Sequence, residues 1–270
     1  MRAAIEQALR RGTYDTIVSP SGFAEVVTRQ LRAISRDEHV RLIFDPYDPR
    51  LRPQEADSLD AAERYDRAVF DITIHNFGVR SAEMLPGGIG YIDLRNFNHP
   101  RWASAAFEAA MNFVAPSKAL IIDLRHNGGG HSDMLTLVLS YFFEEPTKTS
   151  EMTVREKGEV LQTWTYAQVP GKHYGEARRV FVLVGDSTFS AAEGFASITK
   201  AFKKATIIGS RTRGGAHMGD FYPVGDRFVL FVPTAAAERD DAEGRGVLPD
   251  IVVPQADALR RAYLEALIAV

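Results

Sequence analysis

The sequence predicts an α/β protein built from short apolar strands that alternate with amphipathic helices. Apolar runs such as residues 119–124 and 180–184 are typical of buried strands. Segments with apolar residues at helical spacing, such as 102–114, lie between such runs. Glycine-rich loops follow several of the strands, at the position where ligands of α/β sheets usually bind.

We expect two domains, a mostly helical one at residues 1–78 and an α/β core at residues 79–270. In the first domain, Ser19-Pro20-Ser21 is a typical helix start, and residues 39–44 alternate like a short strand. The remaining elements of this domain are a loop with three prolines at 45–53 and a charged helix at 59–69.

The core is predicted as strands and helices in alternation. The expected strands are 90–94, 119–124, 180–184, 205–208 and 227–232, and the expected helices are 102–114, 134–143, 190–202 and 257–268. Between them, about residues 152–166, the sequence indicates a hairpin with its turn near Gly158. This hairpin is a candidate flap over a site.

The composition is typical of a globular protein: of 270 residues, 45% are hydrophobic and 25% charged. The net charge of -3 gives no reason to expect a nucleic-acid partner. The absence of cysteine excludes disulfides, thiolate catalysis and cysteine-based zinc sites. No segment has the character of a signal peptide or a membrane span, so we expect a cytoplasmic protein.

The first candidate site is the loop Arg125-His-Asn-Gly-Gly-Gly-His131. Three consecutive glycines let backbone N–H groups approach a ligand, so the loop could bind a phosphate or stabilise an oxyanion. It has neither the Gly-Lys-Ser/Thr of a Walker A loop nor the Gly-x-Gly-x-x-Gly pattern. A tight turn from strand to helix explains a triple glycine equally well.

The second candidate is Ser190, which opens a predicted helix just after the strand at 180–184. Ser190-Ala-Ala-Glu193 fits a capping box, and most such matches are helix caps and nothing more. The alternative is a nucleophile, for which the helix dipole and the Ala191 N–H would stabilise developing negative charge. The segment is not the Gly-x-Ser-x-Gly elbow of α/β-hydrolases.

The third candidate is the glycine-rich loop from Gly209 to Gly219, which carries His217. A lone loop histidine is more often solvated or structural than catalytic. Beside a nucleophile, however, His217 becomes a candidate general base. The histidines show no metal-binding spacing such as His-Glu-x-x-His, and we expect neither a metal nor another cofactor.

Several segments in fixed order carry a resemblance to a known family. They are Gly90-Tyr-Ile-Asp-Leu-Arg-Asn-Phe97, Ala119 to Gly130, Thr188-Phe-Ser-Ala-Ala-Glu193, Ala205 to Gly209 with Gly214 to His217, Gly246-Val-Leu-Pro-Asp-Ile-Val-Val253, and Asp37-Glu-His39-Val. The chain resembles the tail-specific (C-terminal processing) serine peptidases, and within them the branch related to interphotoreceptor retinoid-binding protein.

The resemblance implies a crotonase/Clp-type core, a ββα spiral, with a small helical N-terminal domain. It implies that Ser190 is the nucleophile. The oxyanion donors would be the backbone N–H of Gly128 or Gly129 and that of Ala191. Glu193 and Asp93 would support the site.

The chain departs from the family pattern at its bases. Processing peptidases carry a Lys base where this sequence has Gly215, and tricorn-type relatives carry a base His where it has Asp93. From the sequence we also expect neither the PDZ domain nor the export signal of the family. His217, and after it His39, are the remaining candidates to activate Ser190.

Three functions are consistent with these residues. The first is a serine hydrolase that cleaves a peptide or acyl bond. The second is a non-catalytic binder of a lipophilic ligand, such as a retinoid or fatty acid. The third is a repurposed enzyme that performs a cyclisation or lyase step on a small molecule. The sequence leaves the oligomeric state open.

Overall fold

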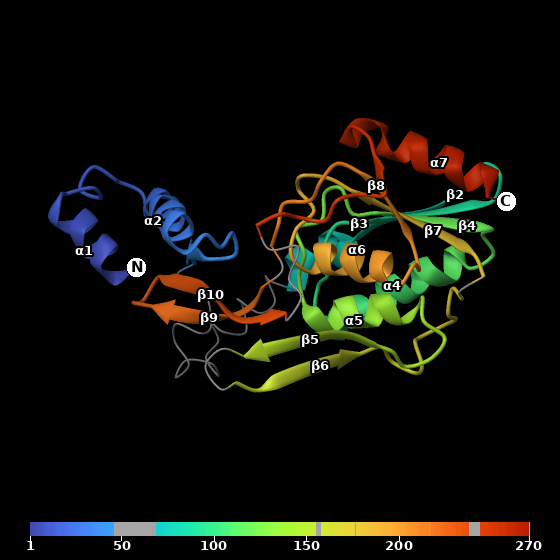
Figure 1. Cartoon of the computed structure of the whole chain (residues 1–270), viewed down its shortest axis with the longest axis horizontal. Coiled ribbons are helices and arrows are strands. Elements are labelled where there is room, and N and C mark those ends of the chain that lie inside the picture. Colours follow the sequence, from blue (N-terminus) through green and yellow to red (C-terminus); the bar gives the residue numbers. More distant parts are fainter. Residues whose placement is uncertain (46–68, 155–157, 176, 216, 238–243, 270) are drawn as a thin grey trace. The chain divides into compact units, whose positions relative to one another are not determined.

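The computed structural model describes residues 1–45, 69–154, 158–175, 177–215, 217–237 and 244–269. The chain forms two compact units (Figure 1). The smaller unit combines Met1–Val69 and Val154–Gly158 with His217–Ala236, and the larger unit holds the rest. The expected division was a single boundary after residue 78. Most of the predicted loop at 45–53 and helix at 59–69 lies outside the described residues.

The smaller unit pairs two helices with three antiparallel strands. The elements are α1 (Arg2–Arg10), α2 (Pro20–Ser35), β1 (Arg41–Phe44), β9 (Met218–Val224) and β10 (Phe228–Ala237). β10 pairs with both β1 and β9. As predicted, α2 begins at Ser19, whose hydroxyl accepts a hydrogen bond from the Gly22 N–H at 3.1 Å.

Side chains of α2 hold β1 against the helix. The Thr28 hydroxyl exchanges two hydrogen bonds with the backbone of Leu42, of 3.2 and 2.9 Å. Arg32 Nε donates to the Val40 carbonyl at 3.0 Å. Phe231 is buried on β10. The turn after α2 therefore has a fixed position in this unit.

The larger unit contains the remaining helices and strands. These are η3 (Asn76–Gly78), β2 (Val79–Leu85), β3 (Ile89–Leu94), α4 (Pro100–Val114), β4 (Ala119–Asp123), α5 (Ser132–Ser140), β5 (Lys148–Val154), β6 (Val160–Trp164), β7 (Arg179–Val184), α6 (Ala191–Ala201), β8 (Thr206–Gly209), β11 (Ile251–Val252), η4 (Gln255–Asp257) and α7 (Ala258–Ile268). β5 and β6 pair in antiparallel fashion, as predicted for the hairpin, and residues 155–157 between them lie outside the described residues.

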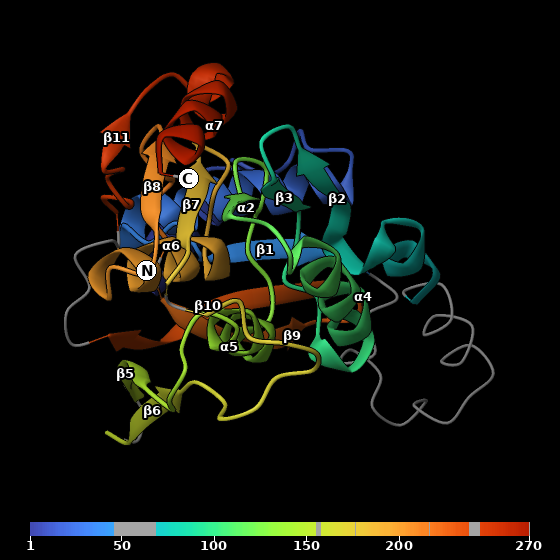
Figure 2. The same cartoon turned by 90° about the vertical axis from the view of Figure 1, so that its right-hand side faces the viewer.

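A six-stranded sheet in the order β11-β8-β7-β4-β3-β2 forms the centre of this unit. All neighbours are parallel except β2 and β3. Alternate residues of β4 and β7 face opposite sides, as strand geometry requires. Leu120 and Ile122 join a core with α4, α5 and α6, while Ile121 and Leu183 join a second core with α7. Figure 2 shows the sheet between these two helical layers.

The parallel strands bring their carboxyl ends to one edge of the sheet. The loop after β4 holds the three glycines, and the turn after β7 holds Ser190. The loop after β8 begins at Ser210. The sheet therefore places all three predicted loops along the same edge, as an α/β fold requires.

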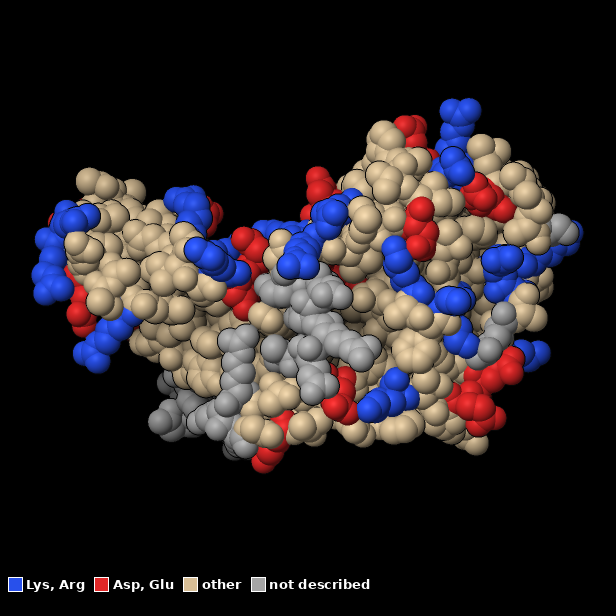
Figure 3. Space-filling model, viewed as in Figure 1, with Lys and Arg blue, Asp and Glu red and all other residues tan. Residues whose placement is uncertain are grey.

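The α/β class is confirmed, and each strand and helix predicted within the described residues is present. β2, β9 and β11 were not predicted from the sequence; the predicted loop to Gly219 runs into β9. On the face drawn in Figure 3, cationic and anionic side chains both occur across the larger unit. Of the helices that the structure describes, none has the length and apolar character needed to cross a bilayer.

The packing of α7 generates a stability prediction. α7 turns three fully buried alanines, Ala258, Ala262 and Ala266, toward the sheet, so its backbone lies close to the strands. Ala262→Leu would insert bulk into this contact and should lower the free energy of unfolding by about 1–3 kcal/mol. Urea denaturation would measure the change. Arg260→Leu, at an exposed position of the same helix, is the control; equal effects of the two substitutions would refute close packing at Ala262.

Candidate active site

Ser190 has a backbone conformation that L-residues rarely adopt. Its φ is 54° and its ψ is -122°, which lies outside the left-handed helical region as well as the ordinary ones. It joins the end of β7 to the first residue of α6, Ala191, and its side chain is half-buried. Strain of this kind costs about 1–3 kcal/mol and is concentrated at functional sites.

The glycine loop packs directly against the Ser190 turn. Gly129 has a φ of +99°, and a Cβ there would lie 2.8 Å from both the Phe189 carbonyl oxygen and Ser190 Cβ. Only a residue without a side chain permits this approach. The Phe189 N–H donates to the Asn127 carbonyl at 3.1 Å, which joins the same two loops through the backbone.

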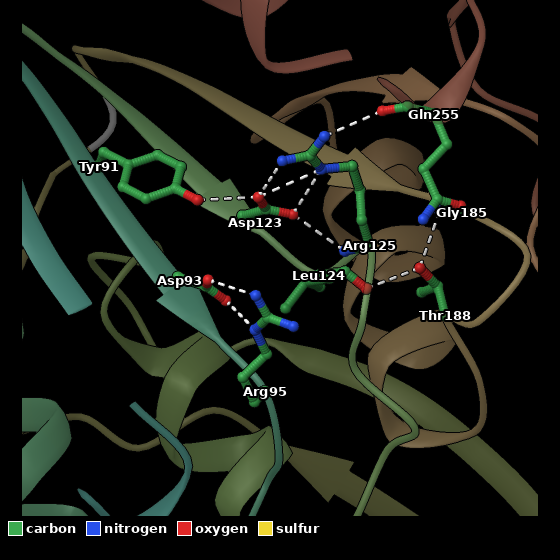
Figure 4. Close-up of polar contacts among 9 residues, drawn as sticks. All are labelled: Tyr91, Asp93, Arg95, Asp123, Leu124, Arg125, Gly185, Thr188 and Gln255. Atoms are coloured by element: carbon green, nitrogen blue, oxygen red, sulfur yellow. Dashed lines mark hydrogen bonds and ion pairs between the residues drawn. The ribbon is translucent and has the colours of Figure 1, made fainter. Parts of the chain in front are cut away.

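Asn127 is fully buried and fixes the glycine loop in place. Its Nδ2 donates to the Leu94 carbonyl at the end of β3, at 2.9 Å. Its Oδ1 accepts from the Gly129 N–H at 2.8 Å. A second buried residue, Thr188, donates to the Leu124 carbonyl at 2.7 Å and accepts from the Gly185 N–H at 2.9 Å (Figure 4). The ends of β3, β4 and β7 are thus hydrogen-bonded to one another.

The backbone N–H groups predicted as oxyanion donors differ in whether they already donate a hydrogen bond within the protein. The Gly129 N–H already donates to Asn127. Among the described residues, the N–H groups of Gly128 and Ala191 have no hydrogen-bond partner. Ala191 is the first residue of α6, so its N–H also lies at the positive end of the helix dipole. Of the predicted oxyanion donors, Gly128 and Ala191 are therefore the ones whose N–H groups are not already used within the described residues.

Glu193 joins the Ser190 turn to the third loop. This carboxylate is 1% exposed. Its Oε2 accepts from the Ser190 N–H at 3.0 Å and from the Gly215 N–H at 2.7 Å. Its Oε1 accepts from the Gly214 N–H at 2.7 Å and from the Thr212 hydroxyl. Burial raises the pKa of the Glu193 carboxyl, while the hydrogen bonds from Thr212 and the three N–H groups act in the opposite direction.

The predicted capping box is present, and it extends beyond the helix. Gly215, at the position of the family's Lys base, contributes its N–H to Glu193 instead of a side chain to Ser190. The Arg213 N–H donates to the Thr188 carbonyl at 3.1 Å, a further bond between the two loops. The structure therefore brings together the glycine loop, the Ser190 turn and residues 212–215.

Asp93 has a structural partner at the edge of the sheet. Its two carboxylate oxygens accept from Arg95 at 2.6 and 2.8 Å (Figure 4). In the parallel pairing of β3 with β4, Asp93 lies opposite Asp123, and Arg125 neutralises Asp123 in the same way. Burial would raise the pKa of Asp123, but the hydrogen bonds from Arg125 and Tyr91 lower it below its usual range. Asp-Leu-Arg thus occurs twice, each carboxylate with its own guanidinium.

His217 and His39, the two candidate bases, both lie beside Asp37 in the smaller unit. His217 Nδ1 lies 2.6 Å from Asp37 Oδ2, and His39 Nδ1 lies 3.7 Å from Asp37 Oδ1. The His217 side chain is 13% exposed and that of His39 only 3%. Burial would raise the pKa of Asp37, but hydrogen bonds from His217 and His39 hold it well below its usual range.

An ionised Asp37 fixes the tautomer of His217. A carboxylate accepts hydrogen bonds only, so the proton of a neutral His217 lies on Nδ1 and the lone pair on Nε2. This is the tautomer that a general base requires. Of the two histidines, His217 is the better candidate because its side chain is the more exposed.

Asp37, Asn127 and Thr212 were missed as site residues by the sequence analysis. Asp37 carried a signal, because Asp37-Glu-His39 was among the matching motifs. Asn127 stands inside the predicted glycine loop, where an Asx turn is a common use of asparagine. The role of Thr212 depends on a long-range contact with Glu193, for which local spacing gives no sign.

Comparisons with known proteins identify the family of the chain. The model of the family described as peptidase family S41 matches residues 88–253. A carboxy-terminal-processing protease from Bartonella bacilliformis is 26% identical in an alignment of 183 residues that covers 63% of this chain. The match covers 39% of that relative, so the chain spans much less than the length of the curated relative.

Two solved structures share the fold. A lipoprotein from Streptococcus agalactiae has a TM-score of 0.64 at 16% identity, over 98% of this chain and 88% of that one. The photosystem II D1 C-terminal processing protease has a TM-score of 0.51 at 23% identity, over 68% of this chain and 50% of that one. Both likenesses concern the fold.

The contacts of Glu193 predict the effect of removing its charge. In Glu193→Gln, the amide NH2 would face donors in either orientation, because both carboxylate oxygens accept hydrogen bonds. Each buried donor left without an acceptor costs about 1–3 kcal/mol, so the free energy of unfolding should fall by at least about 2 kcal/mol. Urea denaturation would measure it, with Glu83→Gln at an exposed strand position as control. A change no larger than that of the control would contradict the assignment.

The lowered pKa of Asp37 predicts a dependence on pH. A carboxyl whose pKa falls on folding stabilises the folded state above its ordinary pKa, here 3.8, and loses that contribution as the pH falls below it. Asp37→Asn should therefore be less stable than wild type at neutral pH, and the difference should shrink in acid. Thermal unfolding at a series of pH values would measure this. The exposed Asp226→Asn is the control, and a difference that is constant with pH would contradict an ionised Asp37 in the folded protein.

Proposed function

Because the chain belongs to peptidase family S41, we propose that it is a serine hydrolase that cleaves peptide bonds with Ser190 as nucleophile. The backbone of Ser190 is the observation that carries this proposal. A helix cap alone needs only ordinary extended dihedrals, whereas Ser190 has a positive φ at a sharp turn from strand to helix. Such turns expose a nucleophilic hydroxyl above a sheet.

Two backbone groups beside Ser190 would stabilise the transition state. The N–H of Gly128 and that of Ala191 have no partner among the described residues. Both belong to segments held by buried hydrogen bonds, through Asn127 and Glu193 respectively. Donors that are already fixed need no reorganisation when the oxyanion forms, and loss of one such donor typically costs about 10²–10³ in rate.

His217 with Asp37 is the proposed base. The 2.6 Å contact between them supports this role, because Asp37 keeps His217 in the tautomer with its lone pair on Nε2. Ser190 belongs to the larger unit and His217 to the smaller one. In this proposal His39 is not a base. It helps to hold Asp37 in place, because its backbone N–H donates to Asp37 Oδ1 at 2.9 Å.

The reaction follows from these roles. Ser190 Oγ attacks the carbonyl carbon of the peptide and gives its proton to His217 Nε2. The carbonyl oxygen becomes an oxyanion bound by the N–H groups of Gly128 and Ala191. His217 then protonates the leaving amine as the C–N bond breaks. Water, deprotonated by His217, hydrolyses the acyl-serine ester and restores Ser190.

The two alternative functions, a binder of a lipophilic ligand and a cyclisation or lyase enzyme, are less well supported than peptide hydrolysis. The family model and the curated relative named as a protease both favour peptide hydrolysis over binding of a lipophilic ligand. A cyclisation or lyase step would use the same N–H pair to hold an enolate but would not need the Ser190 hydroxyl. Removal of that hydroxyl therefore separates this alternative from a hydrolase.

A fluorophosphonate probe tests the nucleophile and its base. Wild type should label, and Ser190→Ala should not, because the probe forms its covalent bond at the serine oxygen. His217→Ala and Asp37→Asn should lower the labelling rate by about 10³–10⁴-fold, as expected for loss of the base or of its orientation. Ser187→Ala, which removes an exposed hydroxyl of the same turn, is the matched control and should label normally.

The double variant Ser190→Ala/His217→Ala sharpens this test. Residues that act as one unit have non-additive effects, so peptide hydrolysis should be no slower in the double variant than in Ser190→Ala alone. Wild-type protein that never labels would overturn the hydrolase proposal. Activity that survives Ser190→Ala would favour an enolate-type reaction instead.

A further inference from the structure

Two histidines outside the proposed catalytic residues lie side by side at the starts of two helices. His99 precedes α4 and His131 precedes α5, and their ring centroids are 4.3 Å apart. The Nδ1 atom of each accepts a backbone N–H two residues later, at 3.1 Å for His99 and 3.2 Å for His131. Each ring therefore caps its helix, a position usually taken by Ser, Thr, Asp or Asn.

The backbone fixes the two histidines relative to each other. The His131 N–H donates to the Phe97 carbonyl at 2.6 Å, and the Phe97 N–H donates to the Gly129 carbonyl at 2.9 Å. A Cβ on Gly130 would lie 2.2 Å from the same Phe97 oxygen, so the backbones at Phe97 and Gly130 are too close for a side chain at position 130. These backbone contacts therefore hold the imidazole rings of His99 and His131 near each other.

A carboxylate completes the cluster. Asp133 Oδ2 lies 3.7 Å from His131 Nδ1. One ligand atom from each of His99, His131 and Asp133 can be chosen so that all lie within 4.8 Å of one another. A tetrahedral ion with bonds of about 2.0–2.2 Å holds its ligand atoms about 3.3–3.6 Å apart. The 4.8 Å limit is wider than this spacing, so the three ligand atoms would have to move closer together when an ion binds.

We propose that His99, His131 and Asp133 bind a divalent transition-metal ion of the Zn²⁺ type. Two imidazoles and one carboxylate are the ligands that zinc accepts, whereas Mg²⁺ and Ca²⁺ prefer oxygen ligands throughout. A helix cap accounts for each histidine separately. It does not account for two imidazoles in contact with a carboxylate beside them. This site goes beyond the proposed hydrolase function, which uses none of the three residues.

Metal binding would change the hydrogen bonding of the cluster. The His131 Nδ1 that faces Asp133 is the same atom that caps α5, so coordination there would replace a solvent-exposed cap bond with a metal bond. His131 directly follows the glycine loop. An ion held by His99 and His131 would therefore tie the end of that loop to the start of α4.

The test is titration of the full chain, without a histidine tag, with Zn²⁺ in a calorimeter. Wild type should bind, and His99→Asn and His131→Asn should each weaken binding at least about tenfold. Asparagine is a good helix cap, so these variants lose the imidazole while α4 and α5 keep a capping side chain. His126→Asn, an exposed histidine of the same loop outside the cluster, is the matched control and should bind as wild type does.

Circular dichroism and melting temperature without metal would verify that the variants are folded. With excess Zn²⁺, the melting temperature of wild type should rise, because an ion that binds only the folded state stabilises it. That rise should be absent in His99→Asn and His131→Asn. Failure of wild type to bind Zn²⁺, or binding that is unchanged in both variants, would overturn the proposal.

Discussion

The buried carboxylate of Glu193 is the contact on which the site depends. It accepts hydrogen bonds from the start of α6 and from the loop after β8, so one side chain joins two segments that follow different strands. A buried carboxylate is costly unless its oxygens are fully hydrogen-bonded. The loop at 212–215 must therefore keep the conformation that supplies these donors, and Ser190 is held by the same requirement.

The remaining loops are fixed by neutral hydrogen bonds and by glycine. Asn127 and Thr188 connect the ends of β3, β4 and β7 through carbonyl and N–H groups that no water can reach. Gly129 allows the backbone to touch the Ser190 turn. The N–H groups of Gly128 and Ala191, which have no partner among the described residues, therefore have set positions before a substrate arrives.

Local patterns predicted most of the fold and part of the site. The apolar runs predicted β4 and β7 because fully buried parallel strands are apolar throughout. β9 was missed because its glycine and proline resemble loop residues; they are tolerated since, among the described strands, β9 pairs only with β10. Asp37 and the pair His99 and His131 depend on contacts between distant segments, and no sequence spacing records such contacts.

The conformation of Ser190 has a consequence for the evolution of the protein. A glycine at this position would relieve the strained φ and ψ angles and would remove the hydroxyl in the same step. Stability therefore favours glycine at this position, whereas nucleophilic chemistry requires serine. Stabilising substitutions at positions away from the site would offset this conflict without changing Ser190. Ser190 therefore combines a strained backbone conformation with a reactive side chain.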